Sequence, residues 1–87
     1  MSATVYWSPR AVRDMERLPL RVASAIATYV DERLASNPPR LSKPLTGELD
    51  GLRSARNGDY RVLFEHDESA ESILIVRVGH RAHVYRP

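Results

Sequence analysis

An Asn-Gly dipeptide at Asn57–Gly58 separates two runs of strand-forming residues, and it constrains the fold more than any other feature of the chain. Asn-Gly is favoured in tight hairpin turns, because both positions accept the positive φ angles that such turns need. The sequence therefore predicts a hairpin with strands over 52–56 and Tyr60–Glu65. A polar turn over 66–71 follows, and then a long, nearly apolar strand over Ser72–Gly79.

A strand and two helices are predicted before this hairpin. Residues 3–7 are rich in β-formers and alternate in polarity, which indicates a first strand. Ser8 suits the N-cap of a helix, and Pro9 suits its first position. Apolar residues at helical spacing predict one helix up to Leu18 and a second from Pro19 to about Ser36, joined by a tight turn.

The remaining segments connect and finish the sheet. Residues 37–51 are rich in Pro and Gly, which indicates an ordered loop, and Ala82–Arg86 is expected to be a short last extended piece. With 87 residues, the chain is expected to form one domain over 1–87. The predicted fold class is α+β: a twisted antiparallel β-sheet of four or five strands, with an N-terminal αα-hairpin packed on one face.

Composition excludes several kinds of site. The chain has no cysteine, so a disulfide framework, a thiol nucleophile and a Cys-based zinc site are excluded. Its three histidines follow no metal-binding spacing, and no Gly-rich phosphate loop is present, so neither a metal nor a cofactor is expected. Without a membrane-spanning run or a signal-peptide pattern, we expect a cytoplasmic protein with no membrane partner.

Arginines alternate with apolar residues in the predicted strands. Successive strand residues point to opposite faces of a sheet. We expect the core-facing residues to be Tyr60, Val62, Phe64, Leu74, Val76 and Val78. Arg61 and Arg77 then point to the open face, and Arg56 reaches it from the strand before the hairpin. If the alternation continues, Arg81, His83 and Tyr85 join them.

Such a surface suits a phosphodiester backbone, because clustered guanidinium groups favour phosphate contacts. A solvated or salt-bridged surface residue is the alternative for any single arginine of the set. Tyr60 and His80 are interpreted as structural residues, since they lie on the core-facing parity. For His83 a surface role and a functional role both stay open.

Two segments carry a resemblance to a known family: "KPLTGELDGLRSARNGDYRVLFEHD" and "ILIVRVGHRAHVYR". They resemble the RelE/ParE superfamily of type II toxins from bacterial toxin–antitoxin pairs, and in particular its RelE-like branch. The most specific parts are "GDYRVLFE", "VGHR" and "VYR". The resemblance extends over nearly the whole chain and implies the RelE-like element order β-α-α-β-β-β(-β).

The resemblance also implies a function. RelE-like members are mRNA interferases, which cut mRNA in the ribosomal A site without a metal; the 2′-hydroxyl attacks the adjacent phosphate. Each toxin has a cognate antitoxin protein as partner. By motif match, Arg61, Arg81 and Tyr85 are expected to be catalytic. Arg56 and Arg77 on the open face, together with Lys43, are expected to bind RNA. The alternative is a ParE-like toxin, which binds DNA gyrase and is not an enzyme.

One departure from the best-known RelE pattern bears on the mechanism. Leu52 and Ser54 stand where that pattern has lysines. Some relatives use a histidine close to the C-terminal tyrosine instead. His83 is well placed for that role and is expected to transfer a proton, because a histidine titrates near working pH.

Overall fold

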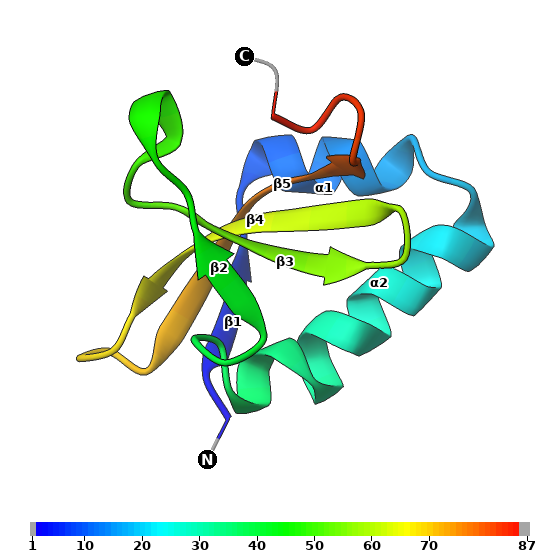
Figure 1. The fold of residues 1–87 in the computed structure, drawn as a ribbon. Coiled ribbons are helices and arrows are strands. Elements are labelled where there is room, and N and C mark those ends of the chain that lie inside the picture. The colour runs from blue at the N-terminus through cyan, green and yellow to red at the C-terminus, as the bar shows by residue number, and fades with distance from the viewer. Residues whose placement is uncertain (1, 86–87) are drawn as a thin grey trace.

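The computed structural model describes residues 2–85 and confirms the α+β fold class. Within these residues, five strands form one sheet in the order β1-β5-β4-β3-β2, and the two helices lie on the same side of it (Figure 1). The elements in chain order are β1 (Thr4–Trp7), α1 (Pro9–Glu16), α2 (Leu20–Glu32), β2 (Ser42–Pro44), β3 (Arg53–Asn57), β4 (Tyr60–Asp67) and β5 (Ser72–His80).

The sheet differs from the prediction in its edges. Strand β1 pairs with β5 in parallel, whereas the other pairs are antiparallel. The strand at the opposite edge is β2, which lies in the segment predicted to be a loop. The prediction of a last extended piece is wrong for Ala82–Tyr85, where the chain forms turns because the amides of His83 and Val84 both donate to the carbonyl of His80. Arg86, the end of that predicted piece, lies outside the described residues.

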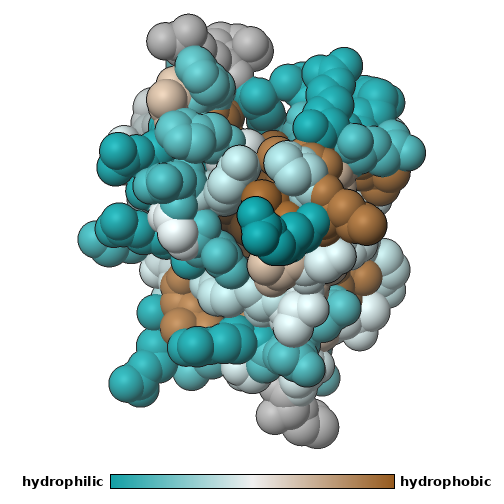
Figure 2. Space-filling view, turned by 90° about the vertical axis from the view of Figure 1, so that its right-hand side faces the viewer, coloured by the Kyte–Doolittle hydropathy of each residue, from teal (hydrophilic) through white to brown (hydrophobic). Residues whose placement is uncertain are grey.

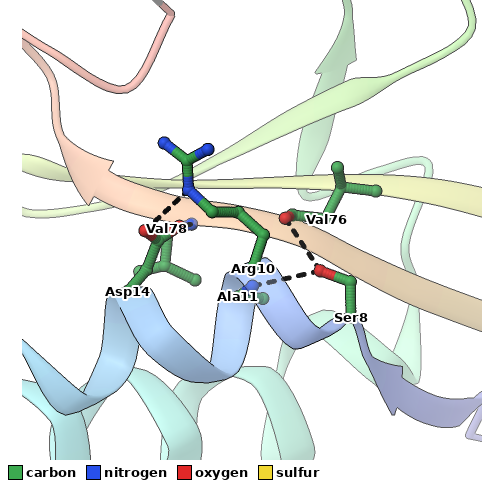
Figure 3. Close-up of polar contacts among 6 residues, drawn as sticks. All are labelled: Ser8, Arg10, Ala11, Asp14, Val76 and Val78. Carbon is green, nitrogen blue, oxygen red and sulfur yellow. Dashed lines mark hydrogen bonds and ion pairs between the residues drawn. The ribbon is translucent and has the colours of Figure 1, made fainter. Parts of the chain in front are cut away.

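Helix α1 begins as the Ser8–Pro9 pair predicts and also completes the edge of β5. The Oγ of Ser8 accepts a hydrogen bond from the amide of Ala11 at 3.0 Å and donates to the carbonyl of Val76 at 2.9 Å (Figure 3). Asp14 accepts the amide of Val78 at 3.0 Å. Since β1 ends at Trp7, these side chains satisfy backbone groups of β5 that the parallel ladder no longer reaches.

The predicted helical hairpin is present, with Pro19 between α1 and α2. Helix α2 ends at Glu32, earlier than predicted, and a short 3-10 turn covers Leu34–Ser36. Neither helix in residues 2–85 is long and apolar enough to cross a membrane. Figure 2 shows the side of the molecule that lies at the right of Figure 1, where some hydrophobic side chains are exposed among hydrophilic ones. Of the helical residues, Val12 is 44% and Leu20 83% exposed.

A bulge in β5 decides which strand residues enter the core. Leu63 pairs with Arg77 and Phe64 with Ile75, so Val76 has no partner on β4. An extra residue of this kind reverses the alternation of faces on either side of it. The core therefore contains Ile73 and Ile75, whereas Leu74 and Val76, which were predicted to fill it, are half-exposed. The bulge leaves Val78 in the core and Arg77 on the open face, opposite Leu63, as predicted.

Candidate functional site

A basic hollow lies at the β2 side of the open face. It has a volume of about 510 Å³ and is lined by β2, β3, β4, the segment before β2 and the C-terminal turn. We call it the basic trough and define it by its polar side chains: Arg40, Ser42, Lys43, Ser54, Arg56, Arg61 and Tyr85. No carboxylate side chain of residues 2–85 lines it.

The register of the sheet explains why these residues meet. Arg56 and Arg61 are Cα partners across the hairpin, and Lys43 is the partner of Ser54. Directly opposed residues share a face, and two like charges in such a pair destabilise the sheet. Among residues 2–85, no carboxylate forms an ion pair with Arg40, Lys43 or the two hairpin arginines. The trough is therefore a concentration of uncompensated positive charge that favours an anionic ligand.

Arg61 is held in place by the hairpin turn, which consists of Gly58 and Asp59, because Asn57 is the last residue of β3 and pairs with Tyr60. Its Nη1 donates to the carbonyls of Gly58 at 3.1 Å and Tyr60 at 3.0 Å. Gly58 has a φ of 60°, which glycine adopts without strain. Because these two bonds fix one end of the guanidinium, the arginine is preorganised, as an electrostatic catalyst must be.

Tyr85 closes the trough from the C-terminal turn. Its hydroxyl lies 2.9 Å from the Oγ of Ser54 on β3. The neighbouring Val84 is 1% exposed and packs over Gly79, where a Cβ atom would lie 3.4 Å from the Cβ of Val84. The missing side chain of Gly79 thus lets Val84 anchor the turn, and the turn places Tyr85 beside the cations.

Arg81 and His83 lie on the same turn but do not line the trough. The amide of Arg81 donates to the carbonyl of Asp59 at 2.7 Å, and its Nε is 3.9 Å from the Asp59 carboxylate. The exposed His83 ring lies 6.1 Å from the ring of His80. His80 itself accepts the Ala82 amide through Nδ1 at 3.1 Å and meets Tyr60 edge-on, which fits its structural interpretation.

The structure thus brings together four of the predicted site residues: Lys43, Arg56, Arg61 and Tyr85. Arg77 is half-buried on the open face outside the trough lining. Arg40 belongs to the trough and was missed, because the prediction left residues 37–51 as a loop of unspecified direction. The tripeptide Ser42–Pro44 forms a strand that pairs with β3, and this pairing brings Arg40 to the site. A strand of only three residues in a proline-rich segment has no recognisable alternation of polarity, so the sequence does not reveal it.

Other parts of the structure are less suited to bind an anion or a metal. A smaller hollow of about 350 Å³ lies between the helices, lined by Trp7, Val12, Met15 and Ala27 together with two acidic residues, and it has no cation. Among residues 2–85, no group of three or more His, Asp or Glu side chains is arranged to hold a metal ion. The basic trough is therefore the candidate site.

The two-helix hairpin on one face of a small five-stranded sheet can be compared with known proteins. Residues 5–85 match the family model described as the ParE toxin of the type II toxin–antitoxin system, parDE. This chain belongs to that toxin family. The resemblance seen in the sequence is confirmed.

The relatives include toxins from Mycobacterium tuberculosis (strain ATCC 25618 / H37Rv). Toxin RelE is 43% identical over 76 residues, which cover 87% of this chain and 78% of the relative. Toxin RelG is 41% identical over 86 residues, which cover 99% of each chain.

Solved structures of toxin–antitoxin complexes show the same fold. The RelBE2 complex from M. tuberculosis has a chain with a TM-score of 0.89 and 38% identity, covering 93% of this chain and 100% of that chain. The archaeal RelE–RelB complex from Pyrococcus horikoshii OT3 gives a TM-score of 0.72 at 28% identity, covering 97% and 100%. The intact Escherichia coli RelBE complex, at 15% identity and a TM-score of 0.74 over 91% and 96%, shows the fold alone.

Proposed function

We propose that this toxin is an endoribonuclease that cuts mRNA on the ribosome and that the basic trough holds the scissile phosphate. The observation that supports this proposal is that the trough has four cations without a carboxylate partner among residues 2–85: Arg40, Lys43, Arg56 and Arg61. An RNA backbone supplies the missing negative charge. The relatives at about 42% identity carry the names RelE and RelG, which agrees with a RelE-type activity.

The reaction is a transesterification that needs no metal. A base removes the proton of the 2′-hydroxyl, the 2′-oxygen attacks the adjacent phosphorus, and the bond from phosphorus to the 5′-oxygen breaks. An acid then protonates the 5′-oxygen, which leaves a 2′,3′-cyclic phosphate on the upstream fragment. Between these steps, negative charge accumulates on the phosphorane oxygens, where fixed guanidinium groups stabilise it.

The trough residues suit these steps. Arg56 and Arg61 face the phosphorane charge, Arg61 from a fixed position. Tyr85 orients the 2′-hydroxyl. His83, two residues before it on the same turn, transfers a proton from outside the trough lining. Arg81 on that turn adds positive charge, and Lys43 on β2 and Arg77 on β5 bind the RNA on opposite sides of the hairpin.

We further propose that a cognate antitoxin neutralises this toxin. The relatives of known structure named above are toxins in complex with RelB-type antitoxins. A segment rich in Asp and Glu complements the trough, because it places carboxylates where the RNA phosphates bind. The relatives' RelE-type names give no support to the alternative of a gyrase-binding toxin, and we do not propose it.

The test is cleavage of mRNA on programmed ribosomes by the purified chain, with the new 5′ ends mapped. We expect cuts inside translated codons and a 2′,3′-cyclic phosphate on the upstream fragment. Arg61→Ala should remove the cuts. Arg21→Ala, an exposed arginine of α2, is the matched control and should leave them unchanged. An intact mRNA with the wild-type chain would overturn the proposal.

A further inference from the structure

The segment before β2 forms the outer wall of the basic trough. It carries Arg40, and β2 carries Lys43; both side chains are exposed and line the hollow. This wall is not part of the hairpin that carries Arg56 and Arg61. The position of this wall depends on the contacts that hold residues 38–42 against the sheet.

Arg53 makes these contacts through hydrogen bonds. Its Nε donates to the Oγ of Ser42 at 2.7 Å, and its Nη2 donates to the carbonyls of Pro39 at 3.1 Å and Ser42 at 3.2 Å. Ser42 in turn donates to the carbonyl of Pro38 at 2.6 Å. One guanidinium on β3 therefore holds the segment on both sides of Arg40.

Arg53 does this from the opposite face of the sheet. Its Cα partner on β4 is Phe64, which lies in the core, so the Arg53 side chain leaves the sheet on the core-facing side. Accordingly it does not line the trough. Its three acceptors are neutral oxygens, and no carboxylate of residues 2–85 forms an ion pair with it. The residue therefore positions a cationic wall without contacting what the trough binds.

The two groups of cations are set apart across the sheet. Arg61 lies on β4 and Lys43 on β2, with β3 between them. Neighbouring strands are about 4.8 Å apart, so these two strands are separated by roughly 10 Å. The hollow of about 510 Å³ is within the size range of a nucleotide-sized ligand, so it has room for more than one phosphate.

We propose that Arg40, together with Lys43, forms a second phosphate subsite next to the scissile one, and that Arg53 is its positioning residue. This inference rests on the proposed function, because its ligand is the backbone of the same single-stranded RNA. The subsite contacts phosphate and therefore selects no base. It aligns the chain so that the neighbouring phosphate meets Arg56 and Arg61.

The test is binding of non-cleavable RNA to the full chain, measured as Kd against salt concentration. The probes are a 2′-O-methyl tetranucleotide with three phosphates and a 2′-O-methyl dinucleotide with one. Arg40→Ala should weaken tetranucleotide binding three- to tenfold and lower the slope of log Kd against log salt by about 0.7, the value for one contact to a single strand. Dinucleotide binding, which needs only the hairpin arginines, should be unchanged.

Arg53→Met tests the positioning role. It should reproduce the loss seen with Arg40→Ala, and the double variant should bind no worse than either single one, because both act through the same contact. Ser42→Ala removes one acceptor of Arg53 and no trough cation, so it should give a smaller loss in the same direction even if Arg53→Met does not fold. Additive losses in the double variant would refute the positioning role.

The outcomes separate this inference from the proposed function. If Arg40→Ala binds the tetranucleotide as well as wild type while Arg61→Ala does not, the second subsite is wrong and the scissile site stands. If the wild-type chain binds neither probe, the second subsite is overturned as well. Cleavage on ribosomes then decides the proposed function by itself.

Discussion

The hydroxyl of Tyr85 lies 2.9 Å from the Oγ of Ser54, although 31 residues separate them in the chain. Ser54 occupies a strand position where the best-known RelE pattern has a lysine. The bond joins the C-terminal turn to β3, and both residues line the trough. The phenol thus lies where a longer cationic side chain at position 54 would extend, and we propose that the tyrosine is a residue of the site.

Two variants separate the proposed role of the Tyr85 hydroxyl in orienting the 2′-hydroxyl from its role in holding the C-terminal turn. Tyr85→Phe should lower mRNA cleavage at least tenfold, because the 2′-hydroxyl loses its orienting group. Ser54→Ala breaks the same hydrogen bond but leaves the phenol, so it should cost less activity. In thermal unfolding the two variants should be alike, each losing about 0.5–1.5 kcal/mol at most. Equal activity losses in both variants would mean that the hydroxyl only holds the turn.

Growth arrest should depend on two arginines outside the core. Arg61→Ala and Arg81→Ala are each expected to abolish it on expression in cells, because Arg61 stabilises the phosphorane from the trough and Arg81, on the turn that carries Tyr85, adds positive charge that attracts the RNA. Arg21→Ala on α2 should remain fully toxic. Circular dichroism should show all three variants folded. An Arg81→Ala protein as toxic as wild type would remove Arg81 from the site.

The sequence predicts this fold best where local rules decide the structure. Asn57–Gly58 specifies the hairpin, and Ser8–Pro9 starts α1, because turn and cap preferences act within a few residues. The bulge at Val76 escapes such reasoning. The run around it is apolar on both faces, so no change of residue type marks the extra residue.

The site is only partly predictable for the same reason. Arg56 and Arg61 follow from the hairpin register, which the turn fixes. Arg40 and the path of Tyr85 depend instead on non-local contacts: the bonds of Arg53 to residues 38–42, and the packing of Val84 over Gly79. Contacts between distant segments leave no periodic signal in the sequence.

Filling the space above Gly79 should displace the C-terminal turn. Gly79→Val places two methyl groups where Val84 packs, and the nearest contact is already 3.4 Å for a Cβ alone. We expect a loss of stability of about 1–3 kcal/mol from overpacking and a strong loss of cleavage, because Tyr85 leaves the trough. Hydrogen exchange should show faster exchange of the His83 and Val84 amides. Unchanged exchange with full activity would contradict this anchoring.

Asp14 should be a larger source of stability than its ion pair suggests. Asp14→Ala leaves the Val78 amide without its acceptor, and the Asp14 side chain is only 10% exposed. We expect a loss of about 1–3 kcal/mol in the free energy of unfolding. Arg10→Ala removes the other partner of Asp14, at an exposed position, and should cost well under 1 kcal/mol. Similar losses from both variants would assign the effect to the ion pair.

His83 is tested by the rate of cleavage. If its side chain transfers the proton, His83→Gln should lower cleavage on ribosomes by about 10²-fold at unchanged affinity for the ribosome. His66→Gln, a histidine of β4 that also lies outside the trough lining, is the matched control and should retain the wild-type rate. If His83→Gln cleaves as fast as wild type, proton transfer passes to another group, and Tyr85, whose hydroxyl lines the trough, is the next candidate.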